Sequence, residues 1–60
     1  MTFIQRNIQI AIEAINNELA SLQFDIDHKH HSAMELFDLL SHMDKLKSEK
    51  AKLEAKLKAI

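Results

Sequence analysis

Large apolar residues recur along the N-terminal half of the chain at alternating spacings of four and three. The series runs through Ile8, Ile12, Ile15, Leu19, Leu22 and Ile26, and Ile4 extends it toward the N-terminus. This spacing places the side chains on one face of an α-helix, with a period close to a heptad. Thr2 followed by Gln5 is a capping-box pattern that favours a helix start beside Thr2. The pattern therefore predicts a helix over about residues 3–27.

A second apolar series of the same kind occupies the C-terminal half. Its members are Leu36, Leu39, Met43, Leu46, Leu53, Leu57 and Ile60, and only Lys50 interrupts it. Ser32 followed by Glu35 is a second capping box, in which the serine hydroxyl accepts from the Glu35 N–H and the glutamate reaches back to the serine N–H. The pattern predicts a helix over about residues 32–59 and a joint over about residues 28–31.

One continuous helix is the alternative to a hairpin. It would place Lys29, Lys47 and Lys50 in core positions, whereas a separate register for the second helix leaves only Lys50 there. The two helices are also of similar length, which suits antiparallel neighbours joined by a short connection. We therefore predict an all-α fold, an antiparallel two-helix hairpin that forms a single domain over residues 1–60.

A lone hairpin of this size is expected to be marginally stable. The chain has 60 residues and no cysteine, so no disulfide can reinforce it. Two amphipathic helices cannot enclose a core between them, and each would leave part of its apolar stripe in water. The sequence therefore predicts self-association, with a homodimer that forms a four-helix bundle as the preferred assembly.

Helix 3–27 carries a second apolar face opposite the main stripe. Phe3, Ile10 and Phe24 lie seven or fourteen residues apart, with Asn17 at the remaining position of the series. An amphipathic helix covered on one side only should be polar there, so these residues indicate a contact with a second copy or with another protein. The predicted interface residues are Phe3, Ile10, Phe24, Ile8, Ile12, Ile15, Leu19, Leu36, Phe37, Leu40 and Met43.

Charge changes this picture little. The formal net charge is −1, so no overall field attracts nucleic acid or a membrane surface. Lys45, Lys52 and Lys56 share one helix face and are the candidates for phosphate contacts, but acidic residues interleave with them and no aromatic residue stands among them. No apolar run has the length of a membrane span, and the N-terminus does not resemble a signal peptide, so we expect a cytoplasmic protein.

The sequence gives little support for catalysis or for metal binding. The sequence holds no phosphate-binding glycine loop and no nucleophile with an evident base, so we expect neither enzymatic activity nor a cofactor. His28, His30 and His31 are suitable metal ligands by type, but their spacing matches no recognised site, and a polar turn is the preferred interpretation. The predicted function is a non-enzymatic protein–protein interaction module or regulatory adaptor. RNA binding through the lysines is the alternative.

Overall fold

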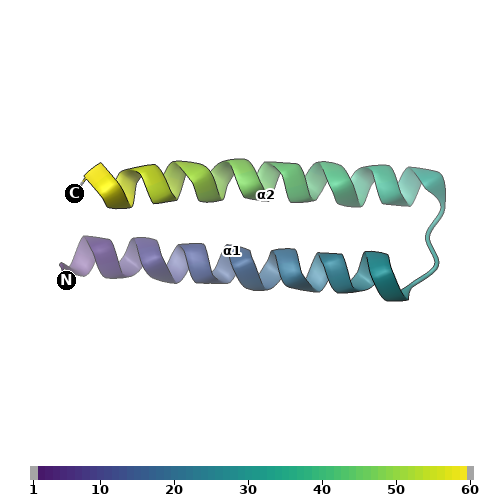
Figure 1. The fold of residues 1–60 in the computed structure, drawn as a ribbon, viewed down its shortest axis with the longest axis horizontal. Helices are drawn as coiled ribbons and strands as arrows, with labels where there is room; N and C mark the ends of the chain where they lie inside the picture. The colour runs from purple at the N-terminus through teal and green to yellow at the C-terminus, as the bar shows by residue number, and fades with distance from the viewer. Residues whose placement is uncertain (1, 60) are drawn as a thin grey trace.

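The computed structural model describes residues 2–59, which form two α-helices and a short connection. Helix α1 spans Phe3–His28 and helix α2 spans Ala33–Ala59. The helices run antiparallel and side by side, with residues 29–32 closing one end and the two chain termini at the other (Figure 1). The prediction of an all-α chain with two helices is confirmed, and the observed helix ends lie within one residue of the predicted ones.

Local hydrogen bonds explain how α1 begins and ends without glycine or proline. At its start the Thr2 hydroxyl accepts from the Gln5 N–H at 3.1 Å, and the Thr2 N–H donates to the Gln5 side chain at 3.0 Å. At its end the His28 ring stacks on Phe24 with centroids 4.0 Å apart and donates to the Phe24 carbonyl at 3.0 Å. Lys29 then adopts an extended backbone, which terminates the helix.

Helix α2 begins at the predicted cap. The Ser32 hydroxyl accepts from the Glu35 N–H at 3.2 Å, and the Ser32 carbonyl accepts from the Leu36 N–H at 3.0 Å. The return contact differs from the predicted one, because the Glu35 carboxylate accepts from the Ser32 hydroxyl at 3.1 Å and not from the Ser32 N–H. Ser32 thereby satisfies a backbone donor that the first turn of a helix otherwise leaves unpaired.

Replacing Ser32 with Ala should lower the free energy of unfolding by about 1 kcal/mol, because the substitution removes the acceptor for the Glu35 N–H. Urea denaturation followed by circular dichroism measures the change. Ser48→Ala is the matched control, since Ser48 is an exposed residue in the interior of α2 and alanine is the better helix former there. Equal midpoints for Ser32→Ala and the parent would contradict the capping role.

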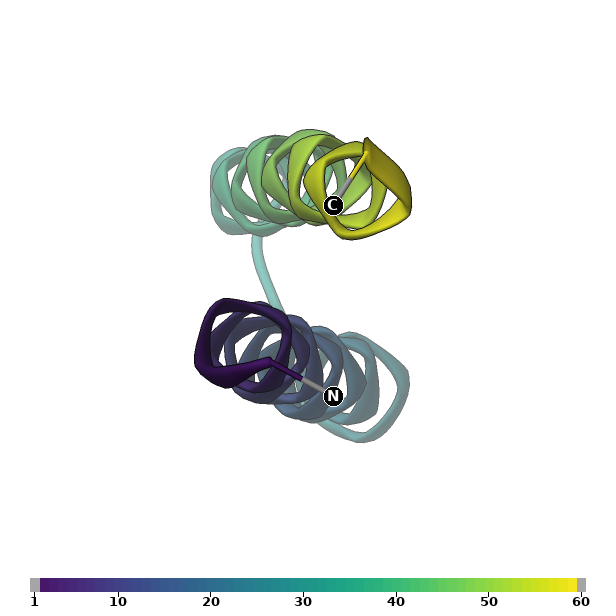
Figure 2. The same cartoon turned by 90° about the vertical axis from the view of Figure 1, so that its left-hand side faces the viewer.

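The core is a single seam between the helices. Met43 and Leu46, which are 6% and 7% exposed, are the only buried side chains among residues 2–59. The α1 stripe from Ile8 to Ile26 and its α2 counterparts are half-buried along the same seam. Seen along the helices, residues 2–59 form two helices that lie side by side with no third element packed against them (Figure 2). The apolar stripes therefore shield each other only in part.

The predicted stripe is wrong at its N-terminal end. Ile4 was expected to extend the stripe but is 60% exposed, and Gln5 is partly buried instead. Two successive spacings of four rotate Ile4 about 80° around the helix from Ile12, because four residues overshoot one turn by about 40°. In the other half of the seam Lys50 occupies its predicted position and is partly buried between Leu46 and Leu53.

One polar side-chain contact links the two helices beside the seam. His42 of α2 and the Glu18 carboxylate of α1 lie 3.1 Å apart across one side of the seam. If residues equidistant from the joint lie opposite each other, a fold about residue 30 brings residue 18 level with residue 42, so the contact agrees with a hairpin that folds at the joint.

Candidate interaction surface

Seven large apolar side chains among residues 2–59 remain in solvent, and we call them the outer apolar surface. Their exposed fractions range from 49% for Ile10 to 81% for Phe3. The set consists of Phe3, Ile4, Ile10, Phe24, Met34, Phe37 and Leu40. Single exposed apolar residues are ordinary on a protein surface, so the number of such residues on a chain of this size makes them the candidate interaction residues.

The members on α2 form one row. Met34, Phe37 and Leu40 are spaced by three residues, which makes them neighbours along the helix, and the row begins in the first turn of α2 beside the joint. On α1, Phe3 and Ile4 lie at the N-terminal end, Ile10 lies in the N-terminal third and Phe24 lies near the joint. Phe3, Ile10 and Phe24 occupy the side of α1 turned away from the main stripe. The outer apolar surface thus has a dense part near the joint and a sparser part toward the termini.

The structure divides the predicted interface residues into two groups. Met43 is buried in the seam, and the other members of this group are half-buried along it: Ile8, Ile12, Ile15, Leu19 and Leu36. The second group is exposed and belongs to the outer apolar surface: Phe3, Ile10, Phe24, Phe37 and Leu40. Sequence reasoning left Ile4 and Met34 out of the set. The three-residue spacing from Met34 to Phe37 was the signal that would have found Met34.

The accessible area is large for the mass of the chain. A compact folded monomer of 6.9 kDa exposes about 4000 Å² by the usual scaling of area with mass. The hairpin exposes 4706 Å², which is roughly 700 Å² more. One partner in a protein–protein interface of standard size contributes about 800 Å². The excess surface is therefore close to what one side of a dimer interface would cover.

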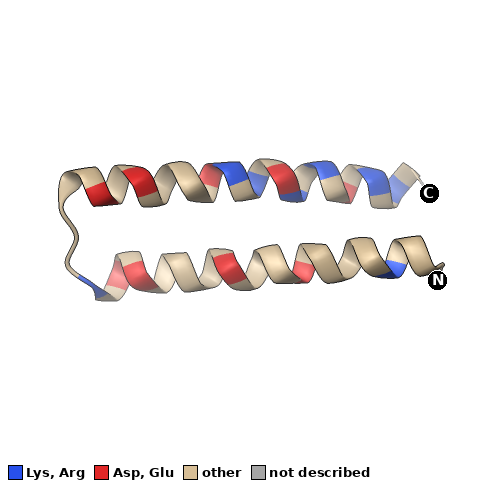
Figure 3. Ribbon diagram, turned by 180° about the vertical axis from the view of Figure 1, so that it is seen from behind, with Lys and Arg blue, Asp and Glu red and all other residues tan. Residues whose placement is uncertain are grey.

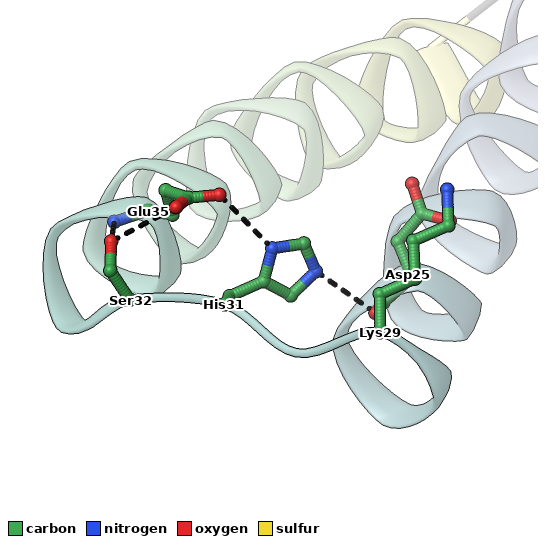
Figure 4. A network of polar contacts seen from close by, with 5 residues as sticks. All are labelled: Asp25, Lys29, His31, Ser32 and Glu35. Atoms are coloured by element: carbon green, nitrogen blue, oxygen red, sulfur yellow. Dashed lines mark hydrogen bonds and ion pairs between the residues drawn. The ribbon is translucent and has the colours of Figure 1, made fainter.

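A second cluster of interest lies at the joint, where His31 links the two helices (Figure 4). Its Nε2 lies 3.0 Å from the Asp25 carbonyl in the last turn of α1. Its Nδ1 lies 3.4 Å from the Glu35 carboxylate in the first turn of α2. The imidazole is only 13% exposed, so the ring occupies the space between the helix ends. Lys29 pairs with the Asp25 carboxylate at 3.3 Å beside it.

The two ring nitrogens of His31 thus each contact an acceptor oxygen, one on a backbone carbonyl of α1 and one on a carboxylate of α2. The Glu35 pKa is lowered below its ordinary value, first by the hydrogen bond with His31 and then by the Ser32 hydroxyl and backbone. His31, Ser32 and Glu35 thus act together at the start of α2.

The lowered Glu35 pKa predicts an acid-sensitive contribution to stability. A carboxyl group whose pKa is lower in the folded chain stabilises the fold above its ordinary value of 4.5, and this contribution disappears as the pH falls through the lower folded value. Thermal melts of Glu35→Gln should therefore lie below those of the parent at neutral pH and converge with them in acid. A difference that stays constant across this range would exclude the linkage. Glu49→Gln, an exposed site in the interior of α2, is the control.

The other histidines lie apart from this contact. His28 is engaged with Phe24, as described above, and His30 is exposed in the connection. Among residues 2–59 no group of three or more histidine, aspartate or glutamate side chains lies in positions that could hold a metal ion. The three joint histidines, although adjacent in sequence, are therefore not brought together as ligands in the structure.

The lysines are concentrated on the C-terminal half of α2 (Figure 3). Lys45, Lys52 and Lys56 are all exposed, as the sequence indicated. Acidic residues occur among these lysines on α2, and further acidic residues lie on α2 toward the joint (Figure 3). In the described part of the chain no pocket accompanies the lysines or any other group.

The chain matches no protein-family model, and searches among curated proteins and among solved structures find no similar protein. Neither α1 nor α2, within the described residues, contains a stretch long and apolar enough to cross a membrane.

Proposed function

We propose that this protein is a non-enzymatic protein–protein interaction module that acts as a self-associating helical hairpin, with a homodimer as its working form. The outer apolar surface is the observation that carries the proposal. Only two side chains of the described residues are buried in the single hairpin, while seven large apolar side chains remain in water. Burial of that surface stabilises the fold by about 25 cal/mol per Å² of apolar area, which a marginal chain of this length needs.

The dimer joins the two groups of interface residues into one structure. The seam holds each hairpin together, and the outer apolar surface meets a second copy. The excess accessible area of roughly 700 Å² matches the contribution of one partner to a standard interface, as estimated above. A second protein of complementary shape is the other occupant that this surface would accept, which is the adaptor form of the same proposal.

Sedimentation equilibrium over a series of protein concentrations tests the proposal. We expect at least a dimer at micromolar concentration, together with a melting midpoint that rises with concentration, because mass action couples assembly to folding. A helical monomer that melts cooperatively at a midpoint independent of concentration would overturn the proposal.

Nucleic-acid binding is the second candidate function, and the exposed lysines of α2 are the observation that favours it. Lys45, Lys52 and Lys56 lie on the C-terminal half of α2, where positive charge exceeds negative charge. Any such binding would be electrostatic, so changing all three lysines to Gln should weaken it and flatten its salt dependence. We expect no tight binding of RNA or duplex DNA at physiological salt. A strong, salt-sensitive gel shift by the parent protein would reverse the order of the two candidates.

A further inference from the structure

Charge is distributed unequally between the two halves of the hairpin. The joint half, residues 16–44, carries six carboxylates and only one lysine, a formal charge of −5 with histidine counted as neutral. The open half, residues 1–15 and 45–60, carries seven basic and three acidic residues, a formal charge of +4. The two values add to the net charge of −1 for the whole chain. Folding the chain at its joint is what separates them, because it brings the acidic ends of both helices together.

The acidic half consists of residues from both helices. Asp25 and Asp27 lie in the last turns of α1, and Glu35 and Asp38 lie in the first turns of α2. Lys29 is the one basic residue there, and its ammonium is already paired with Asp25 at 3.3 Å. Figure 3 shows the acidic positions gathered toward the joint on both helices and the basic positions along the far half of α2. The hairpin is thus an elongated body with a negative end and a positive end.

A two-fold symmetric dimer of hairpins has two possible orientations. In the aligned dimer the two joints lie together, so that −5 faces −5 and +4 faces +4. In the opposed dimer the joint of each hairpin lies beside the open end of the other, so that −5 faces +4 at both ends. The apolar side chains do not decide between the two, because Phe24 and Phe37 lie in the joint half and Phe3 and Ile10 lie in the open half.

We propose that the hairpin dimerises in the opposed orientation, with the acidic joint half of each copy covering the basic open half of the other. This inference rests on the proposed self-association and adds the orientation of the partner copy. Opposite charges at the rim of an interface attract, and like charges placed together disfavour the alternative arrangement. The charge asymmetry therefore stabilises the opposed dimer and destabilises the aligned one.

The dimensions of the hairpin make the two ends electrostatically independent. Its Cα atoms extend over 44 Å, whereas the screening length at physiological ionic strength is about 8 Å. Each end therefore responds to the charges placed directly against it and hardly to those at the far end. The net charge of the chain is consequently close to zero although its two ends produce local electrostatic fields of opposite sign.

A distance between the two joints measures the orientation directly. The chain lacks cysteine, so His30→Cys provides a single attachment site for a spin label, and His30 is exposed and makes no hydrogen bond with other described residues. In the opposed dimer the two labels should lie apart by a distance close to the 44 Å length of the hairpin. In the aligned dimer they would lie at a separation comparable to its 16 Å width. Double electron–electron resonance distinguishes the two lengths.

The sign of a charge effect provides an independent test. Lys52→Gln combined with Lys56→Gln lowers the positive charge of the open half, so it should weaken the opposed dimer, by roughly three- to tenfold in Kd, and would tighten the aligned dimer. Lys29→Gln is the matched control in the joint half, and it should leave the opposed dimer as tight as the parent or tighter. Circular dichroism verifies that each variant is as helical as the parent.

The outcomes separate this inference from the proposed function. A dimer with the long label distance and weakened binding in the double variant supports the opposed orientation. A dimer with the short distance, or one that tightens when the two lysines are neutralised, overturns the orientation and leaves self-association intact. A monomer in sedimentation equilibrium at the highest concentrations overturns both.

Discussion

Replacing Leu46 with Ala should unfold most of the protein at concentrations where the parent chain is helical. Leu46 and Met43 are the only buried side chains of the described residues, so the change opens a cavity in the centre of the seam. Truncation of a buried leucine costs about 2–5 kcal/mol. A chain of this size rarely has more than about 3–5 kcal/mol of stability in total. Far-UV circular dichroism during thermal melting measures the loss.

Leu40→Ala is the matched control, because it removes the same atoms from the same helix. Leu40 is 54% exposed in the hairpin, against 7% for Leu46. In an isolated hairpin the Leu40 change should therefore cost much less. If Leu40 is covered by a second copy, its truncation should instead lower the melting midpoint in a manner that depends on protein concentration. An unchanged midpoint for Leu46→Ala would contradict the position of the core.

The helices and the joint were predictable because local signals agree with the long-range pattern. The alternating spacing of Ile8, Ile12 and Ile15 favours one helical face, and the caps at Thr2 and Ser32 mark the starts of the two helices. The break between the helices followed from a change of register rather than from glycine or proline. A short helical sequence specifies its fold when its local capping signals and its long-range apolar pattern predict the same helices.

The joint contacts could not be predicted in the same way. His31 was grouped with His28 and His30 as a possible metal ligand, but the structure places its ring between the Asp25 carbonyl and the Glu35 carboxylate. That position depends on the backbone of the connection, where no periodic pattern specifies the direction of a side chain. The contact between Glu18 and His42 was missed for a related reason, since residues beside a stripe meet only once the alignment of the helices is fixed.

The sequence predicts that part of the outer apolar surface lies opposite the main stripe, but it does not identify the molecule that would cover this surface. The seven-residue spacing of Phe3 and Ile10 placed both opposite the main stripe, and the structure leaves both exposed. A partner that covers Phe3 and Ile10 would be a second molecule, and the single hairpin gives only indirect information about it. The excess area and the separation of charge are two such signals, and both arise from the folded arrangement rather than from any short segment of sequence.

Replacing Ile10 with Ser tests whether this surface serves the bundle or an outside partner. Ile10 lies in the N-terminal third of α1, on the side away from the seam, and is half exposed in the single hairpin. If a second copy covers it, the change replaces a buried apolar side chain by a polar one, and we expect a loss of about 2–5 kcal/mol and dissociation of the dimer. Sedimentation equilibrium and concentration-dependent melting report both effects.

Asn17→Ser is the matched control for Ile10→Ser, because Asn17 continues the same face of α1 one heptad further along and is already polar and exposed. It should leave the dimer and its melting midpoint unchanged. If Ile10→Ser behaves like this control and yet loses the ability to capture a defined protein partner, the surface belongs to an adaptor, since a branched side chain near the centre of a contact often carries much of the binding energy. We expect the dimer to dissociate, because a chain with two buried side chains needs its outer apolar surface for its own stability.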